Sequence, residues 1–307
     1  DQSDSSNSGH PLRFSTTSNG THGGGSEYTT GVTTTGTPGS AGAKTTIVVA
    51  SSAPTLYYYC SSHSGMGGQA NTNSTAGASN FDGSIQATVK ANPTAGFSIV
   101  SWTANGSTSP YPTIGHGLNA KPLFYMIKSR DGARDWIVYT DVIDGSLDFL
   151  RLNSTAAKQN SALPAVADSS VFYAGGSDIN TSGEDIIAYC ISPVAGYSAV
   201  GSYEGTGTSD NSAPFIWTGF RPKWVMVKKT TEAKDWVVWD TSRSPYNLAT
   251  DALRPNLSNA ELSGFDIDVV SNGFKLRDAE STLNTSGTYL YVAFAEHPLS
   301  LNGGLAR

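Results

Sequence analysis

The feature that most constrains this 307-residue chain is an internal repeat. The matching segments are 95–98 with 195–198, 122–128 with 222–228, 133–139 with 233–239, 150–153 with 253–256, and 180–183 with 284–287. The offset grows slightly in the last two pairs, which indicates short insertions in loops of the second copy, where a shared fold tolerates them. The repeat predicts two copies of one folded unit.

Short apolar runs within each copy indicate β-strands. Residues 123–127 and 224–227 are rich in β-branched and aromatic side chains and lie close to Gly, Asn or Pro. Residues 136–139 and 289–294 alternate cleanly, which predicts antiparallel strands with one face buried and one facing solvent or a partner. We expect an all-β fold in which each copy is a β-sandwich or jelly-roll-like module, with helix confined to short stretches such as residues 256–262.

Composition changes before the repeats begin. The N-terminal part is rich in Gly, Ser and Thr and holds two strand-like runs, 45–50 and 56–60. Residues 67–84 contain almost no apolar side chains that could be buried in a core, so they predict a linker. The expected domains are a small one over residues 1–68, a linker over 69–94, and β repeats over 95–194 and 195–307.

Charge and apolar content argue against two classes of partner. The net charge is −6 and only 14% of residues are charged, so we do not expect a nucleic-acid-binding surface. No run approaches the ~20 apolar residues that cross a bilayer, and no basic-then-apolar leader opens the chain, so we do not expect membrane insertion. The chain begins with Asp1, as expected for a processed product or a fragment.

Enzymatic motifs are missing from the sequence, so we do not expect an enzyme. The chain has no Gly-x-Ser-x-Gly elbow, no phosphate-binding glycine loop and no metalloprotease His/Glu spacing. Asp135 and Asp235 recur before tryptophans and are expected to be turn residues, as is His116. Cys60 and Cys190 lie far apart in different contexts, so a disulfide scaffold is not expected.

A second feature near the N-terminus has chemical content. Cys60, His63 and Met66 follow a strand-like run of tyrosines and enter a Gly-rich loop. His10 lies upstream, beside residues that look like a strand able to pack next to the Cys60 strand. A thiolate, two imidazoles and a thioether are the ligands of a type 1 copper site, so these four residues are candidate metal ligands and copper is the candidate cofactor.

Residues 9–68 resemble the cupredoxins. The Cys-x2-His-x2-Met spacing is similar to the shortest ligand loop of that family, the amicyanin type. The resemblance implies a cupredoxin-like domain in which His10, Cys60 and His63 bind copper and Met66 is the axial ligand. It also implies that this domain is N-terminally incomplete, because cupredoxins have two or three strands before the first histidine ligand. One alternative function is therefore electron transfer by a copper protein.

The rest of the chain resembles tail-fibre-associated proteins of marine tailed bacteriophages. The phrases that carry the resemblance are 95–102, 114–118, 150–153, 271–277 and 291–298, together with the final Ala306 and Arg307. The resemblance implies a structural or adhesive virion protein of the tail fibre, spike or capsid surface that mediates host attachment or assembly. It implies a homotrimer or other symmetric oligomer and contacts with other virion proteins.

Two further hypotheses remain open. Six tryptophans could stack on sugars of a host-surface glycan; they are Trp102, Trp136, Trp217, Trp224, Trp236 and Trp239. Because most of them lie in strands and recur between the copies, core positions are the stronger expectation, and loops 205–213 and 175–182 are better candidates for binding. A secreted, extracellular adhesin or filament subunit, whose first domain receives strands from a neighbouring chain, is the other alternative.

Overall fold

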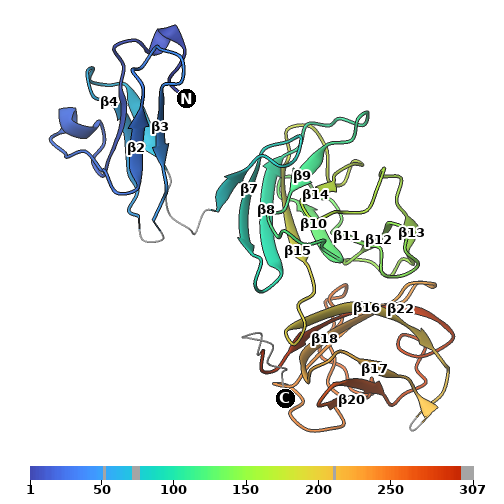
Figure 1. Cartoon of the computed structure of the whole chain (residues 1–307). Coiled ribbons are helices and arrows are strands. Elements are labelled where there is room, and N and C mark those ends of the chain that lie inside the picture. Colours follow the sequence, from blue (N-terminus) through green and yellow to red (C-terminus); the bar gives the residue numbers. More distant parts are fainter. Residues whose placement is uncertain (51–52, 71–76, 210–211, 299–307) are drawn as a thin grey trace. The chain divides into compact units, whose positions relative to one another are not determined.

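The computed structural model describes residues 1–50, 53–70, 77–209 and 212–298 and is all-β, as the sequence predicts (Figure 1). The chain divides into two compact units, Asp1–Ala78 and Ser79–Arg307. Within the described residues, no helix is long and apolar enough to cross a membrane.

The N-terminal unit contains two small antiparallel sheets. Its strands are β1 (Leu12–Ser15), β2 (Val32–Thr35), β3 (Lys44–Ile47), β4 (Leu56–Cys60) and β5 (Gly67–Ala70). They form a three-stranded sheet in the order β1-β4-β5 and the hairpin β2-β3. Two single 3-10 turns, Ser5–Asn7 and Gly20–Gly23, complete it. Leu56 and Tyr59 of the central strand β4 are buried, so the apolar run that follows Thr55 supplies much of this small core.

The first repeat forms the module that we call module 1, residues 79–194. Its strands are β6 (Ala78–Asn80), β7 (Ala87–Asn92), β8 (Phe97–Thr103), β9 (Thr113–Gly115), β10 (Phe124–Ser129), β11 (Ile137–Thr140), β12 (Asp148–Arg151), β13 (Gln159–Asn160), β14 (Val171–Tyr173) and β15 (Asp185–Ile191). They form an eight-stranded sheet, β13-β12-β11-β10-β15-β8-β7-β6, and the pair β14-β9.

The second repeat forms module 2, residues 195–298. Its strands are β16 (Ser198–Gly205), β17 (Phe215–Trp217), β18 (Pro222–Lys229), β19 (Trp236–Asp240), β20 (Ile267–Val270), β21 (Gly273–Leu276) and β22 (Gly287–Ala295). Its sheets have the orders β16-β22-β18-β19 and β17-β21-β20. The central strand order β8-β15-β10-β11 of module 1 corresponds to the order β16-β22-β18-β19 of module 2. The sequence repeat is therefore also a repeat of sheet topology.

The linker predicted over residues 69–94 is wrong for the part that the structure describes. Residues 71–76 lie outside the described residues, but β7 pairs with β8 along most of its length. Ala87 and Val89 are buried in the core of module 1, where they pack with Val100 and Trp102. β7 has few large side chains because the neighbouring strand β8 supplies them to the core. Its composition therefore did not indicate a strand.

The short helix expected over residues 256–262 does not form. The side chain of Asn256 accepts a hydrogen bond of 2.9 Å from the main-chain N–H of Trp236 and donates one of 2.7 Å to Asp235. It therefore caps the start of β19 instead of starting a helix of its own. Ala252 and Leu262 form an isolated β-bridge, so the segment between them is a loop.

Three clusters of buried apolar side chains hold residues 79–298 together. One lies within module 1 and one within module 2. The third, which we call the intermodule core, joins the two large sheets; its buried members are Phe124, Val138, Leu150, Ile191, Met226, Trp236, Val238, Leu290 and Val292. The second face of each large sheet is thus buried against the other module. The sequence pattern predicted that this face meets solvent or a partner, and the partner is the other module of the same chain.

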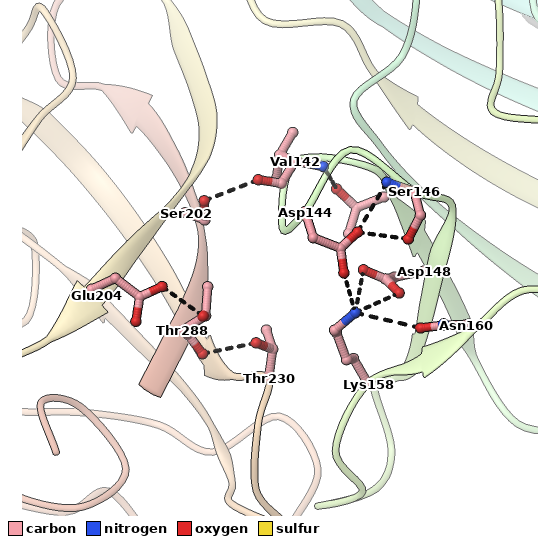
Figure 2. A network of polar contacts seen from close by, with 11 residues as sticks. Val142, Asp144, Ser146, Asp148, Lys158, Asn160, Ser202, Glu204, Thr230 and Thr288 are labelled. Carbon is pink, nitrogen blue, oxygen red and sulfur yellow. Dashed lines mark hydrogen bonds and ion pairs between the residues drawn. The ribbon is translucent and has the colours of Figure 1, made fainter. Parts of the chain in front are cut away.

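Hydrogen bonds cross the boundary between the modules beside the intermodule core. The hydroxyl of Ser202 donates to the carbonyl of Val142 at 2.9 Å (Figure 2). The main-chain N–H of Lys158 donates to the carbonyl of Thr230 at 2.8 Å. These bonds satisfy main-chain groups that apolar packing alone would leave unpaired.

The ammonium of Lys158 ties together the loop that reaches module 2. Its Nζ lies 2.6 Å from Asp144 and 2.8 Å from Asp148. Figure 2 shows the ammonium in contact with both carboxylates. Burial raises the pKa of Asp148, whereas hydrogen bonds from Lys158 and Ser146 lower the pKa of the exposed Asp144 to about 2. The buried carboxylate is therefore balanced by a cation at contact distance.

Candidate metal centre

Strand pairing brings His10 and Cys60 together. β1 pairs antiparallel with β4, with Leu12 opposite Cys60 at one end of the sheet. The main-chain N–H of Ser61 donates to the carbonyl of Pro11 at 3.0 Å, which extends this contact one step past the strands. His10 precedes β1 by two residues and therefore lies beside the end of β4, as the sequence predicts.

Three of the four predicted ligands converge on one point. Cys60 Sγ lies 3.7 Å from His10 Nδ1 and 3.6 Å from His63 Nδ1. The two imidazole rings are 4.6 Å apart between centroids, and the three ligand atoms all lie within 4.8 Å of one another. Cys60 is buried, His10 is half-buried and His63 is exposed. Both histidines turn the same nitrogen towards the sulfur.

The two sulfur–nitrogen separations fit a shared metal ion. With metal–sulfur and metal–nitrogen bonds of about 2.3 and 2.0 Å, a tetrahedral angle puts sulfur and nitrogen about 3.5 Å apart and a trigonal angle about 3.7 Å apart. The distances from Cys60 Sγ to the two Nδ1 atoms fall in this range. A thiolate with two imidazoles suits copper or zinc, and a metal would supply the positive charge that stabilises the Cys60 thiolate.

Met66 borders the same site without joining the cluster of three. Its side chain is 46% exposed, and it lines a cavity of about 180 Å³ with His10, Tyr59 and Cys60. Three of the four predicted ligands, His10, Cys60 and Met66, therefore border one cavity, and His63 is not among its lining residues. His22 is separate, because its Nε2 contacts the main-chain carbonyl of Cys60 at 3.1 Å.

The loop from β4 to Met66 is held in place by hydrogen bonds. The N–H of Cys60 donates to the carbonyl of Met66 at 2.9 Å, which closes the loop. The side chain of Asn19 donates to the hydroxyl of Ser64 at 2.9 Å and accepts from the N–H of Gly65 at 2.8 Å. The sequence analysis did not identify Asn19, since it lies in a Gly/Thr-rich segment far from the ligands and carries no local signal.

The two aspartates expected to be turn residues have structural partners. Asp135 lies 2.7 Å from Arg151 and accepts a hydrogen bond from Asn153. In module 2, Asp235 repeats this arrangement with Arg254 at 2.7 Å and with an asparagine. The duplicated Leu-Arg-x-Asn segments already contained this signal, because the arginine and asparagine recur together with the aspartate.

His116 follows β9 and is fully buried, with Nδ1 accepting a hydrogen bond from the N–H of Leu118 at 3.2 Å. Burial lowers the pKa of His116. Its role is local: it fixes the main chain where β9 ends, in keeping with the turn role that the sequence predicts.

The tryptophans separate into core and surface residues. Trp102, Trp236 and Trp239 are buried, as expected for core positions, whereas Trp217 is 66% exposed. Phe215, two residues earlier on β17, is 46% exposed on the same face of the strand. Of the two candidate binding loops, residues 175–179 line a cavity, and residues 210–211 of the other loop lie outside the described residues.

Comparisons with known proteins give one match. No curated protein and no solved structure is similar enough to match. The model of a family described as a domain of unknown function, DUF7483, matches residues 69–298. These residues are most of the chain and span both β modules, so the chain belongs to the DUF7483 family.

Proposed function

We propose that this chain is a structural and adhesive component of a phage virion, at a tail fibre, a spike or the capsid surface, that mediates host attachment or assembly. The observation that carries the proposal is the intermodule core, which makes residues 79–298 one continuous body. A protein that presents contact surfaces on a particle benefits from modules that do not move independently. The resemblance of the repeats to tail-fibre-associated proteins supports the same role.

The proposal includes a homotrimer or other symmetric oligomer that contacts other virion proteins. Each copy would present the same surface, so several weak contacts with a host glycan would add up to firm attachment.

The surface that we assign to attachment is the exposed face of β17. A Cβ added at Gly273 would lie 3.0 Å from the ring of Phe215, and one added at Gly219 would lie 3.2 Å from the ring of Trp217. Each ring therefore lies over a glycine and turns its other face to solvent. Module 1 has Thr113 and a glycine at the corresponding positions of β9, so the aromatic pair belongs to module 2 alone.

Proteomics of purified particles tests the virion role. Phage particles whose genome encodes this chain are banded on a density gradient and digested with trypsin, and we expect peptides from residues 79–298 in intact particles. Peptides that occur only in the host cell-surface or secreted fraction would overturn the proposal in favour of the extracellular adhesin.

An adsorption assay tests the attachment surface. The double variant Phe215→Thr with Trp217→Gly gives β17 the residues of β9, and we expect it to bind host cells at least several-fold more weakly. Trp136→Phe, which changes an indole away from β17, is the matched control. Equal binding by wild type and the double variant would remove β17 from the attachment role.

We also propose a second function, copper binding by a cupredoxin-like N-terminal unit. The observation that favours it is the convergence of His10 Nδ1 and His63 Nδ1 on Cys60 Sγ, at sulfur–nitrogen separations that suit one metal ion. Met66 would supply the weak axial ligand from the rim of the site. Such a centre would either stabilise this small unit or transfer electrons.

Optical titration with Cu(II) tests this function. We expect an intense visible charge-transfer band in the wild-type protein at a ratio of one copper per chain, and no band in Cys60→Ala. Cys190→Ala is the matched control, because Cys190 is fully buried in module 1 and burial raises its pKa to about 12. Absence of the band from wild-type protein with unperturbed circular dichroism would reject the copper site.

A further inference from the structure

We propose that module 1 carries a binding pocket for the ring of a neutral hexose. The pocket is a cavity of about 220 Å³ between β11, β12 and two loops, residues 161–163 and 175–179. The residues on which the argument rests are Tyr139, Phe149, Arg151, Leu163 and Asp178. The inference is independent of the attachment surface on β17 and of the virion role, since it concerns a different module and a single sugar ring.

The register of β11 and β12 creates the floor of the pocket. Tyr139 lies opposite Phe149, and Ile137 lies opposite Arg151, so all four side chains project from one face of the sheet. The guanidinium carbon of Arg151 lies 5.3 Å from the centroid of the Phe149 ring. An aromatic surface and a cation are thus fixed side by side.

Gly175 lets the walls of the pocket approach each other. A Cβ at this position would lie 2.6 Å from the ring of Tyr111 and 2.7 Å from a methyl carbon of Leu163. Only a residue without a side chain allows both groups to pack against the main chain here. The following residues, 176–179, then pass along the cavity and place Asp178 at its lining.

The chemistry of the lining matches a sugar ring. Among the described residues, neither the Asp178 carboxylate nor the Tyr139 hydroxyl takes part in a hydrogen bond, so both groups remain available to a ligand. Burial raises the pKa of Tyr139, which keeps its hydroxyl protonated and able to donate. Phe149 and Leu163 offer apolar contact to the C–H groups of a pyranose, while polar groups meet its hydroxyls.

Charge selects a neutral ligand over an ionic one. Arg151 and Asp178 carry opposite charges and both line the cavity. Arg151 is also held by Asp135 at 2.7 Å and by the side chain of Gln159 at 3.2 Å. A ligand with a net charge would be repelled by one of the two lining groups, whereas a hydroxyl accepts from the guanidinium and donates to the carboxylate.

Module 2 provides a closed version of the same place. Trp239 occupies the position of Tyr139, and it is fully buried with Nε1 donating to the carbonyl of Phe265 at 2.8 Å. The bridge between Val238 and Leu253 corresponds to the pairing of Val138 with Leu150, so Ala252 stands where module 1 has Phe149. A larger indole and a covering loop thus fill the space that module 1 leaves open.

Saturation-transfer NMR on the full chain tests the pocket. The probes are D-glucose, D-galactose and D-mannose, each added singly in excess. We expect saturation transfer from the wild-type protein to at least one of them. Tyr139→Trp fills the pocket as module 2 does, and we expect it to weaken binding about tenfold or more, a difference of about 1.4 kcal/mol. Asp178→Asn keeps the shape and removes the carboxylate, and we expect a similar loss.

Two controls keep the result interpretable. Thermal unfolding shows whether Tyr139→Trp still folds, and Asp178→Asn carries the test if it does not. The double variant Phe215→Thr with Trp217→Gly should retain the sugar signal. No saturation transfer from wild-type protein, or an undiminished signal in both pocket variants, overturns the proposal. A signal lost only in the β17 variant overturns it too and assigns sugar binding to the attachment surface instead.

Discussion

The indole Nε1 of Trp236 donates a hydrogen bond of 2.9 Å to the main-chain carbonyl of Arg151, across the boundary between the two modules. Trp236 is fully buried in the intermodule core. Its counterpart Trp136 is half-buried and stacks on Tyr189 at 6.3 Å between ring centroids. One repeated residue therefore has two roles, and only the copy in module 2 joins the modules.

Trp236→Phe should destabilise the protein. The change keeps an aromatic ring but removes the indole donor, which leaves the Arg151 carbonyl with only the 3.3 Å hydrogen bond from the N–H of Ser154. It also opens space in the intermodule core, and we expect a total cost of about 1–3 kcal/mol. Urea denaturation measures the free energy of unfolding. Trp136→Phe is the control and should lose less, so equal losses in the two variants would contradict this account of the interface.

Lys228 should make stability rise with pH above about pH 8. Its ammonium is fully buried and donates to the carbonyls of Thr155, Lys229 and Lys234 at 2.8–3.1 Å. Burial lowers the pKa of Lys228 from 10.5 to about 8. Between these values the unfolded chain binds the proton and the folded protein releases it, so the free energy of unfolding should increase with pH, by up to about 1.4 kcal/mol per pH unit.

Lys228→Met isolates this effect from other titrating groups. Chemical denaturation of both proteins from pH 7.5 to 10.5 gives the difference in the free energy of unfolding, and we expect that difference to grow in favour of the wild type as pH rises. Parallel curves would show that Lys228 keeps its proton in the folded protein across the whole range.

Asn19→Ala should weaken metal binding without removing a ligand. Asn19 holds Ser64 and Gly65 of the ligand loop, and its loss frees the loop that carries His63. Groups that orient ligands in this way are worth about tenfold or more in affinity. Competition with a chromophoric copper chelator measures the affinity, with Asn80→Ala in module 1 as the matched control. Unchanged affinity would leave the loop positioned by the hydrogen bond between Cys60 and Met66 alone.

Gly96→Ala should be far more damaging than Gly183→Ala. Both glycines have a positive φ, +64° and +84° respectively. A Cβ at Gly96 would lie 1.9 Å from the carbonyl oxygen of Ser192, whereas one at Gly183 meets nothing within 4 Å. We expect the free energy of unfolding to fall by about 3 kcal/mol in Gly96→Ala, which combines backbone strain with the clash. We expect it to fall by about 1 kcal/mol in Gly183→Ala, which has backbone strain alone. Differential scanning calorimetry compares them, and similar melting temperatures would contradict the clash.

Local patterns predicted the convergence of His10, Cys60 and His63 and most of the strands. The short spacing of Cys60, His63 and Met66 places them on one loop regardless of how the rest of the N-terminal unit folds. Placing His10 beside them required only one correct prediction, the pairing of β1 with β4. Asn19 could not be predicted, because its role depends on how a remote loop folds back. A side chain that orients a ligand through space leaves no periodic signal in the sequence.

Relations between modules were harder to read. The alternation in residues 289–294 shows that two faces exist, but the same pattern fits a face towards solvent, another chain or another module. Trp136 and Trp236 sit in nearly identical segments, and only the packing distinguishes them. The pocket beside Tyr139 could not be predicted either. It depends on the difference in size between Tyr139, which leaves the space open, and Trp239, which fills the corresponding space in module 2.

The intermodule core is built from the same face of both repeats. Met126 and Met226, Phe124 and Trp224, and Val138 and Val238 all belong to it or pack against it, so the cluster contains corresponding residues of the two repeats. Two identical single modules would bury this face by forming a dimer, and such a dimer would dissociate on dilution. Joining the copies in one chain turns that concentration-dependent association into a step of folding, so the pairing persists even where the protein is scarce.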